Sequence, residues 1–208
     1  MANSFGSLAF TPIVKELQQR HGSRRQYERL AAQGTSYQGL GPDEREFIAE
    51  RDSFYMASIG STGWPYVQHR GGPKGFLKIL GNQTIAFADY RGNKQYISTG
   101  NLLTDDRVAL ILVDYPRQAR LKILGHAKIR ERAEAGELLE VVRDEGENNF
   151  VVRVYVIHLE AFDWNCPQHI TPRFTVDEIR TILAPFEERL QALEAENARL
   201  RTQLAAKG

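Results

Sequence analysis

The chain contains 208 residues, of which 27 are Lys or Arg and 26 are Asp or Glu, and 42% are hydrophobic. This length allows one sizeable core with appended segments and is too short for several ordinary domains. The net charge of +1 excludes a large positive field for nucleic acid or an anionic membrane, and the single cysteine excludes an intramolecular disulfide framework. No apolar run approaches the roughly 20 residues that span a bilayer, and the N-terminus lacks the pattern of a secretory signal. We therefore expect a soluble, cytoplasmic, globular protein.

Residues 1–45 are predicted to form a helical arm. Thr11 can cap a helix that Pro12 opens at its first position. The segment over residues 14–32 carries many charges and few large apolar side chains, which is typical of a helix that lies on another element rather than in the core. A second, short helix is predicted over residues 43–51.

Residues 46–173 are predicted to form one β-rich domain. Gly, Pro or Asn separates short apolar runs there, and these predict strands over residues 54–59, 66–69, 76–80, 84–88, 108–113, 120–130 and 151–161. Helices are expected over residues 93–103 and 133–143. The hairpin spacing of the strands favours an antiparallel barrel with flanking helices, a mainly β member of the α+β class, over a sheet of βαβ units.

Residues 174–208 are predicted to be a separate capped helix followed by a short coiled coil. Thr175 and Glu178 have the spacing of a capping box, and Pro185 is expected to interrupt the helix or restart it. Beyond Pro185, apolar residues recur at the alternating spacing of heptad positions a and d. Position a holds Leu183, Leu190, Asn197 and Leu204, and position d holds Phe186, Leu193 and Leu200.

The charges that flank these heptads favour two parallel helices. Arg189 and Glu196 fall at position g, and each meets an opposite charge five positions later, at Glu194 and Arg201, on a partner helix. A lone Asn at an a position fixes the register of parallel two-stranded coils. An amphipathic helix packed on its own barrel stays open as the alternative.

Four stretches hold more Gly, basic and aromatic residues than folding requires, over residues 68–78, 89–95, 115–120 and 164–169. In the second stretch, a helix that begins near Asn93 would offer unpaired N–H groups to an anion. Lys94 and Arg91 add positive charge, and Gly92 allows close approach to the backbone. The pattern suits a terminal phosphate, although a solvated basic turn explains the stretch equally well when it is taken alone.

Three motifs occur in a recognisable order along the barrel region. Residues 73–78 loosely match a strand motif Arg-x-Val-Leu-Leu-Lys, and residues 87–94 look like an aromatic-Thr-Asn-x-x-Ser-Arg-Lys element. Residues 117–120, followed by Gly125, are similar to an Arg-Gln-x-Arg strand opening. With this strand pattern, residues 45–170 resemble the flavin-binding split-barrel superfamily that includes pyridoxamine 5′-phosphate oxidase.

The resemblance implies FMN bound at the interface of a homodimer of split barrels. Lys78 and Lys94 would pair with the FMN phosphate or line its approach. Because Asn93 stands where the family has Arg, one ionic contact would be lost or would move to Arg91 or Arg70. The backbone of residues 75–77 would pass along the flavin. The candidate cofactor-binding residues are Arg70, Gly75, Phe76, Leu77, Lys78, Tyr90, Arg91, Asn93, Lys94, Gln95, Gln118, Trp164, Asn165 and Gln168.

Two roles are expected within this set. The flavin ring needs apolar cover on its face and hydrogen-bonding groups at its pyrimidine end. Phe76, Tyr90 and Trp164 are candidates for the cover. The candidates for the polar edge are Gln118, Asn165 and Gln168.

The sequence departs from the oxidase pattern at two places. Residues 129–135 and 161–173 match neither the substrate-phosphate segment nor the C-terminal segment of the oxidase proper, so pyridoxamine phosphate is disfavoured as the substrate. The resemblance therefore implies an FMN-dependent oxidoreductase of an unidentified small molecule, in which no side chain is itself catalytic. The sequence does not name the hydride donor, and NAD(P)H could dock transiently over the flavin. A flavin- or haem-binding sensor without turnover, and a structural dimer whose coil recruits a partner, stay open as alternatives.

Cys166 and His169 form a Cys-x-x-His pair. A structural zinc site needs four ligands and no second pair stands nearby, so no metal is predicted. No activated-nucleophile pattern surrounds the cysteine. A loop that packs against the cofactor is the favoured interpretation.

Overall fold

The computed structural model describes residues 5–33, 39–144, 150–165 and 168–206. The chain divides into two units, one of residues 1–114 and 119–168, the other of residues 115–118 and 169–208. The helices of the first unit are α1 (Phe5–Ala9), α2 (Pro12–Arg20), α3 (Arg24–Gln33), α4 (Pro42–Ala49), α5 (Ile97–Leu102), α6 (Arg132–Ala135) and α7 (Leu138–Val142). Its strands are β1 (Ser53–Ile59), β2 (Pro65–Gly71), β3 (Lys78–Ile79), β4 (Thr84–Tyr90), β5 (Arg107–Asp114), β6 (Ala119–Glu131) and β7 (Val151–Asn165).

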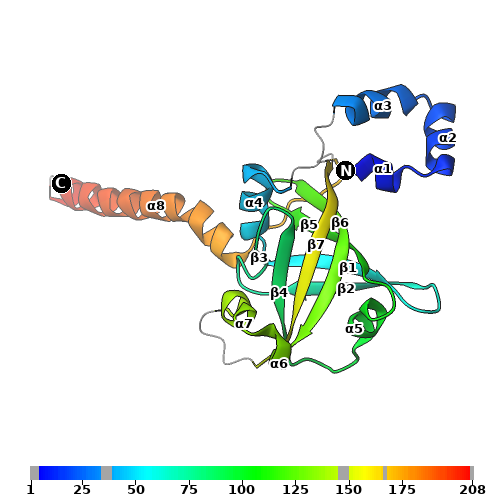
Figure 1. Ribbon diagram of the computed structural model, residues 1–208. Coiled ribbons are helices and arrows are strands. Elements are labelled where there is room, and N and C mark those ends of the chain that lie inside the picture. The colour runs from blue at the N-terminus through cyan, green and yellow to red at the C-terminus, as the bar shows by residue number, and fades with distance from the viewer. Residues whose placement is uncertain (1–4, 34–38, 145–149, 166–167, 207–208) are drawn as a thin grey trace. The chain divides into compact units, whose positions relative to one another are not determined.

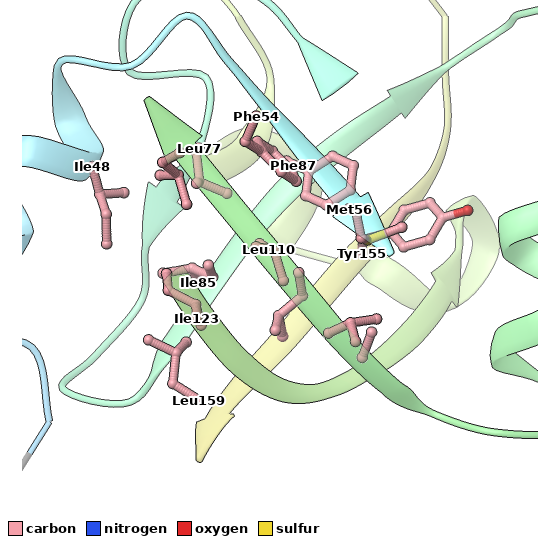
Figure 2. Close-up of a cluster of buried hydrophobic side chains, with 14 of the residues drawn as sticks. Ile48, Phe54, Met56, Leu77, Ile85, Phe87, Leu110, Ile123, Tyr155 and Leu159 are labelled. Atoms are coloured by element: carbon pink, nitrogen blue, oxygen red, sulfur yellow. The ribbon is translucent and has the colours of Figure 1, made fainter. Parts of the chain in front are cut away.

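The seven strands form one antiparallel sheet in the order β2-β1-β5-β6-β7-β4-β3, so β2 and β3 are its two edges (Figure 1). The predicted split barrel with flanking helices is confirmed. The strands alternate buried and exposed residues, as in β1 and β5, because successive side chains point to opposite faces of a sheet. The inward residues form a core that includes Phe54, Met56, Leu110, Ile123 and Ile157 (several drawn in Figure 2).

A β-bulge between Leu124 and Gly125 bends the long hairpin of β6 and β7. A Cβ atom at position 125 would lie 2.4 Å from the carbonyl oxygen of His158. Real Cβ atoms do not come so close to backbone oxygen, so only glycine lets the two strands approach each other here. The bulge adds the local twist that a barrel of long strands requires.

A buried ion pair attaches the end of α4 to the end of β5. The guanidinium of Arg51 donates from Nη2 to Oδ2 of Asp114 at 2.7 Å, and both side chains are almost fully buried. Arg51 also donates to the carbonyl oxygens of Phe47 and Val113. Because these acceptors replace lost water, Arg51 can be buried without an unpaired charge.

The N-terminal arm contains two helices, α2 and α3, where one was predicted. Thr11 caps α2 as expected, since its hydroxyl accepts a hydrogen bond from the N–H of Val14 at 3.4 Å, and Pro12 opens the helix. The single helix expected over residues 14–32 is wrong, because Gly22, with φ +77°, separates α2 from α3. Left-handed backbone of this kind ends a helix, and glycine adopts it without steric cost.

Three other elements are shorter than predicted. Strand β3 covers only Lys78–Ile79, because Phe76 and Leu77 turn into the core after Gly75 at φ +79°. The helix expected over residues 93–103 begins at Ile97. The helix expected over residues 133–143 is two short helices, α6 and α7, separated by Gly136 at φ +50°.

The second unit contains α8, which runs from Val176 to Ala205. Its predicted capping box is confirmed, since the hydroxyl of Thr175 accepts from the N–H of Glu178 at 3.2 Å and the Glu178 carboxylate accepts from the N–H of Thr175 at 2.8 Å. The predicted interruption at Pro185 is wrong, because Pro185 lies inside one continuous helix. Among the described residues, no helix combines the length and apolar character needed to cross a bilayer.

Candidate functional site

A cleft of about 780 Å³ lies where the split in the barrel separates β2 from β4 and β7. This volume is within the range of sites that hold small molecules and cofactors, about 300–1,000 Å³. The residues that line it come from β2, β4, α5, β7 and the loops beside them. They are Tyr66, Gln68, Arg70, Asp89, Tyr90, Arg91, Gly92, Asn93, Lys94, Gln95, Tyr96, Ile97, Ser98, Thr99, Phe150, Val152, Arg153 and Tyr155.

The cleft has an excess of positive charge. Four of the lining residues, Arg70, Arg91, Lys94 and Arg153, are cationic, and only Asp89 is anionic. Concave walls that expose one sign of charge raise the local concentration of the opposite ion. The cleft is therefore suited to an anionic ligand, although the whole chain is almost neutral.

An ion pair crosses the split at the floor of the cleft. Arg70 on β2 donates from Nη1 to Oδ1 of Asp89 on β4 at 2.8 Å, and both side chains are largely buried. Its other terminal nitrogen lies 3.4 Å from the hydroxyl of Tyr155 on β7. Because β2 does not neighbour β4 or β7 in the sheet order, these side chains join strands that backbone hydrogen bonds do not join.

Arg153 is the second buried cation of the floor, with only 7% of its side chain exposed. Its Nη1 donates to Oγ1 of Thr99 at 2.8 Å and lies 3.9 Å from Oδ2 of Asp89. Its Nε is 3.3 Å from a carboxylate oxygen of Glu131, without the alignment of a hydrogen bond.

The Nε atoms of Arg70 and Arg153 are both buried and have no hydrogen-bond partner in the described chain. A buried donor that lacks an acceptor costs about 1–3 kcal/mol, and more when it is charged. Both side chains line the cleft, so their charges add to the positive potential that an anionic group bound there would meet. The residues of the floor are therefore compatible with an anionic group on a bound ligand.

Tyr155 connects the hydrophobic core to the cleft. Its ring is fully buried and stacks on Phe87 with centroids 4.9 Å apart and an interplanar angle of 8°. Its hydroxyl shares a hydrogen bond of 2.8 Å with Thr99, and Figure 2 shows that oxygen at the margin of the core cluster. The packed ring therefore fixes the position of a polar group at the floor.

An exposed loop over residues 91–96 forms the rim of the cleft. Lys94 and Tyr96 have φ of +60° and +55°, a region that non-glycine residues rarely adopt. Such backbone strain is more common at ligand sites than elsewhere. Because α5 begins only at Ile97 and has six residues, the helix N-terminus predicted at Asn93 is absent, and the charge of this rim comes from side chains.

A family model described as pyridoxamine 5′-phosphate oxidase matches residues 40–162, more than half of the chain. The chain belongs to this family. The match covers β1–β6 and most of β7, and it includes every residue that lines the cleft. No curated protein matches the sequence.

Solved structures with a similar fold have low sequence identity to this member of the family. HupZ of Group A Streptococcus is 15% identical, with a TM-score of 0.48, over 65% of this chain and 99% of that chain. A Clostridium acetobutylicum protein related to general stress protein 26 is 17% identical, with a TM-score of 0.46, over 66% and 94% of the two chains. An F420 reductase is 19% identical, with a TM-score of 0.41, over 59% and 98%.

The structure brings six of the predicted site residues together in the cleft of this family member: Arg70, Tyr90, Arg91, Asn93, Lys94 and Gln95. Lys78 lies beside the cleft rather than in its lining. Its Nζ is 3.7 Å from Oδ1 of the buried Asp144, whose other oxygen accepts a hydrogen bond from the Tyr90 hydroxyl at 3.0 Å. Phe76 and Leu77 lie in the core, where Phe76 stacks on Phe54, and Gly75 precedes them in a turn.

The remaining predicted residues lie outside the lining of the cleft. The indole of Trp164 donates to Glu44 at 2.7 Å and packs edge-on against Phe47 of α4, with centroids 4.8 Å apart. Asn165 ends β7, opposite Arg120. Gln168 lies in an exposed turn of the first unit.

Gln118 and His169 belong to the second unit. The amide nitrogen of Gln118 donates to the carbonyl oxygen of Ile170 at 2.6 Å. Both Gln118 and His169 have left-handed backbone, with φ of +52° and +66°. The prediction for Cys166 lies outside the described residues. Within those residues, no group of three or more His, Cys, Asp or Glu side chains could hold a metal ion.

Sequence reasoning missed three lining residues of the floor, Thr99, Arg153 and Tyr155. A signal for Arg153 was available, because an Arg between two valines of an apolar strand needs buried partners. Thr99 gave no such signal, since it reaches the floor only because α5 packs there.

Proposed function

We propose that the chain is an FMN-binding flavoprotein and an oxidoreductase that acts on a small molecule. The observation that carries the proposal is the pair of buried arginines at the floor of a cleft that is lined by four cations and one carboxylate. Membership of the pyridoxamine 5′-phosphate oxidase family adds support for a flavin as the ligand.

In this proposal the phosphate is held by cations of the rim and floor. Lys94 and Arg91 approach from the exposed loop, while Arg70 and Arg153 lie below them. Charge-assisted hydrogen bonds to phosphate are about twice as strong as neutral ones. Asp89 keeps both arginines in place through its two carboxylate oxygens, so the floor is preorganised before the ligand arrives.

The polar groups of the floor would orient the rest of the cofactor. Gln68 accepts a hydrogen bond of 2.7 Å from the buried Ser98, which fixes its amide at the cleft wall. Tyr66 and Tyr96 supply aromatic surface to the same cleft. Bound flavin supplies the electron-transfer chemistry, and this chain's residues position it and limit access of water.

A homodimer of barrels and a transient NAD(P)H donor complete the proposal. Edge strand β2 alternates exposed and half-exposed residues, and Val67 on it is 60% exposed. An edge strand with an exposed apolar side chain is a surface that a second copy can cover.

The test compares FMN with riboflavin, which lacks the phosphate, in fluorescence titrations of the purified apo protein. We expect FMN to bind more tightly than riboflavin, and the preference to weaken with salt because it depends on charge. Equal affinity for both would contradict a phosphate site, and no binding of either would contradict the proposal.

Turnover is tested separately with NADH or NADPH and an electron acceptor. Oxidation of the nicotinamide by the FMN-loaded protein supports the oxidoreductase. Binding without turnover would instead favour a flavin sensor.

A further inference from the structure

Helix α8 carries an apolar seam along its whole length, because Pro185 does not break it. The heptad pattern seen beyond Pro185 extends backwards, where Val176 occupies position a and Ile179 occupies position d. The seam is therefore formed at position a by Val176, Leu183, Leu190, Asn197 and Leu204, and at position d by Ile179, Phe186, Leu193 and Leu200. No residue of α8 is buried, and eight of these nine are large exposed hydrophobics.

Pro185 lies on the face of the helix opposite the seam. It occupies heptad position c, and the carbonyl that loses its hydrogen-bond donor belongs to Thr181, at position f. Positions c and f face solvent in a two-stranded coil, so water can satisfy that carbonyl. The proline therefore leaves the packing of the seam intact.

The charges beside the seam distinguish a parallel pair from an antiparallel one. In a parallel, in-register pair, Arg189 meets Glu194 of the second copy and Glu196 meets Arg201, and the twofold symmetry repeats both contacts. Asn197 then faces Asn197 of the second copy, where the two amides can hydrogen-bond.

An antiparallel pair that sets Leu200 against Leu183 keeps eight of the nine seam residues in layers, without Val176, and is less favourable. It places Asn197 against Phe186, so the amide has no polar partner across the seam. It also places Glu187 opposite Glu194, and Arg180 opposite Arg201, which are repulsive pairs. Only the contact of Arg189 with Glu196 remains attractive.

We propose that α8 is a homodimerisation element that pairs in parallel and in register with α8 of a second copy of this chain. A single Asn at an a position specifies register and oligomer state, as in parallel two-stranded coils. The surface is self-complementary, as a twofold interface requires. It belongs to the second unit and does not depend on the ligand of the cleft.

The test is a disulfide crosslink in the full-length protein. Cys166 is first replaced by Ser, so that an introduced thiol is the only one in the chain. Leu200→Cys then places a thiol at a d position, and Ala195→Cys, at position f on the outer face, is the matched control. In a parallel pair two residues at position 200 lie opposite each other, within the roughly 7 Å between Cα atoms that a disulfide needs.

We expect mild oxidation to convert most of the Leu200→Cys protein into covalent dimer and little of the Ala195→Cys protein. In the antiparallel pair the two residues at position 200 are about 25 Å apart along the axis, and crosslinks would form instead in a mixture of Leu183→Cys and Leu200→Cys proteins. That result would overturn the parallel arrangement. Absence of crosslinks in every variant would assign the seam to a different partner and overturn the proposal.

A charge swap provides an independent measurement. Arg189→Glu should lower the crosslinking yield of the Leu200→Cys protein at low salt, because it faces Glu194 of the second copy. Adding Glu194→Arg should restore the yield in a parallel pair. Failure of the double variant to recover would contradict the g-to-e contacts, since an antiparallel pair offers Arg189 no contact with Glu194. FMN affinity should stay unchanged in all these variants, so the outcome is distinguishable from that of the cofactor proposal.

Discussion

Lys94 is the rim residue whose contribution to ligand binding can be isolated most cleanly. It is exposed and lines the cleft, so its removal disturbs no buried contact. Arg70 and Arg153, in contrast, also hold the floor together through Asp89 and Thr99, and substituting either one would change both the fold and the affinity. The exposed cation is therefore the better probe of the phosphate.

We expect Lys94→Ala to weaken FMN binding about 10-fold to 100-fold. A hydrogen bond to a charged group contributes about 1.5–3 kcal/mol, which corresponds to this range of affinity. Riboflavin affinity should not change, because the contact is to the phosphate. Lys128→Ala is the matched control, since Lys128 is an exposed residue of β6 outside the cleft. An unchanged FMN affinity in Lys94→Ala would assign the phosphate to Arg70 or Arg91.

A second residue-scale prediction concerns the turn before β5. The side chain of Arg107 donates to Asp105 at 2.8 Å and 2.5 Å, and its backbone N–H donates at 3.1 Å. These hydrogen bonds lower the pKa of Asp105 from 3.8 to about 2, and those from the Arg107 side chain have the larger effect. A carboxylate with a depressed pKa stabilises the fold above its unfolded pKa, and that contribution is lost as the pH falls from about 4 to about 2.

We expect an NMR titration to give Asp105 a pKa of about 2. Arg107→Gln should raise the pKa only part of the way to 3.8, because the backbone donor remains. Arg130→Gln removes the same charge from an exposed position of β6 and should leave the Asp105 pKa unchanged. An ordinary Asp105 pKa in the native protein would contradict these hydrogen bonds in solution.

At the scale of elements, α4 is held to the barrel by contacts at both of its ends. Arg51 follows its C-terminus and pairs with Asp114, while Glu44 in its first turn accepts the indole N–H of Trp164. Phe47, between them, packs against Trp164. These contacts give Trp164 a structural role that the sequence did not predict.

We expect Trp164→Ala to lower the free energy of unfolding by more than the 0.5–1.5 kcal/mol of an aromatic pair, since a hydrogen bond is lost as well. FMN affinity should change little, because Trp164 does not line the cleft of its own chain. Denaturant unfolding and FMN titration together check this. Lost FMN affinity with unchanged stability would support the ring-covering role expected from the sequence. Leu103→Ala, at an exposed apolar residue, is the control for surface truncation.

The sequence predicted elements whose signal is local. A strand forms in each of the seven segments predicted between turn residues, and the capping box at Thr175 follows from its own four residues. Prediction failed where a few backbone angles decide the outcome. Left-handed backbone at Gly136 and at Tyr96 shortens the helices near them, and local propensity does not show it.

The cleft was predicted only in part, because the sequence shows which residues are adjacent in the chain but not which distant strands meet. Arg91, Asn93 and Lys94 are adjacent in the chain, so a single loop revealed them. Arg70 and Arg153 come from strands far apart in the sequence, and only the register of the sheet and the split between its edges bring them to one floor. Sequence spacing alone could not indicate their pairing with Asp89.

At the scale of the whole molecule, two units carry separate functions in our proposals. The family match and the cleft both lie in the first unit, and the seam of α8 lies in the second. Because the cleft and the seam lie in different units, the cofactor and the coil can be tested independently. If both units pair in one dimer, each interface strengthens the other, because it holds the two copies at a high effective concentration.

We expect deletion of residues 176–208 to leave a protein that still binds FMN with native affinity. On dilution, its dimer should dissociate at a higher protein concentration than the dimer of the full chain, because the seam is lost. Light scattering over a dilution series and FMN titration measure the two properties. A deletion protein that no longer binds FMN would show that the first unit needs α8, and one with an unchanged dimer would place the partner of α8 elsewhere.

The close approach at Gly125 has a consequence for mutational tolerance. Every other amino acid adds the same Cβ atom, which would lie 2.4 Å from the His158 carbonyl oxygen, so the chemistry of the side chain beyond it is irrelevant. A saturation library at position 125 should therefore give no graded series: alanine and tryptophan should fail alike, in a screen for folded protein. Gly81 and Gly100, which have nothing within 4 Å of an added Cβ, should accept many residues in the same screen. A tolerated alanine at position 125 would show that β6 and β7 can separate at the bulge.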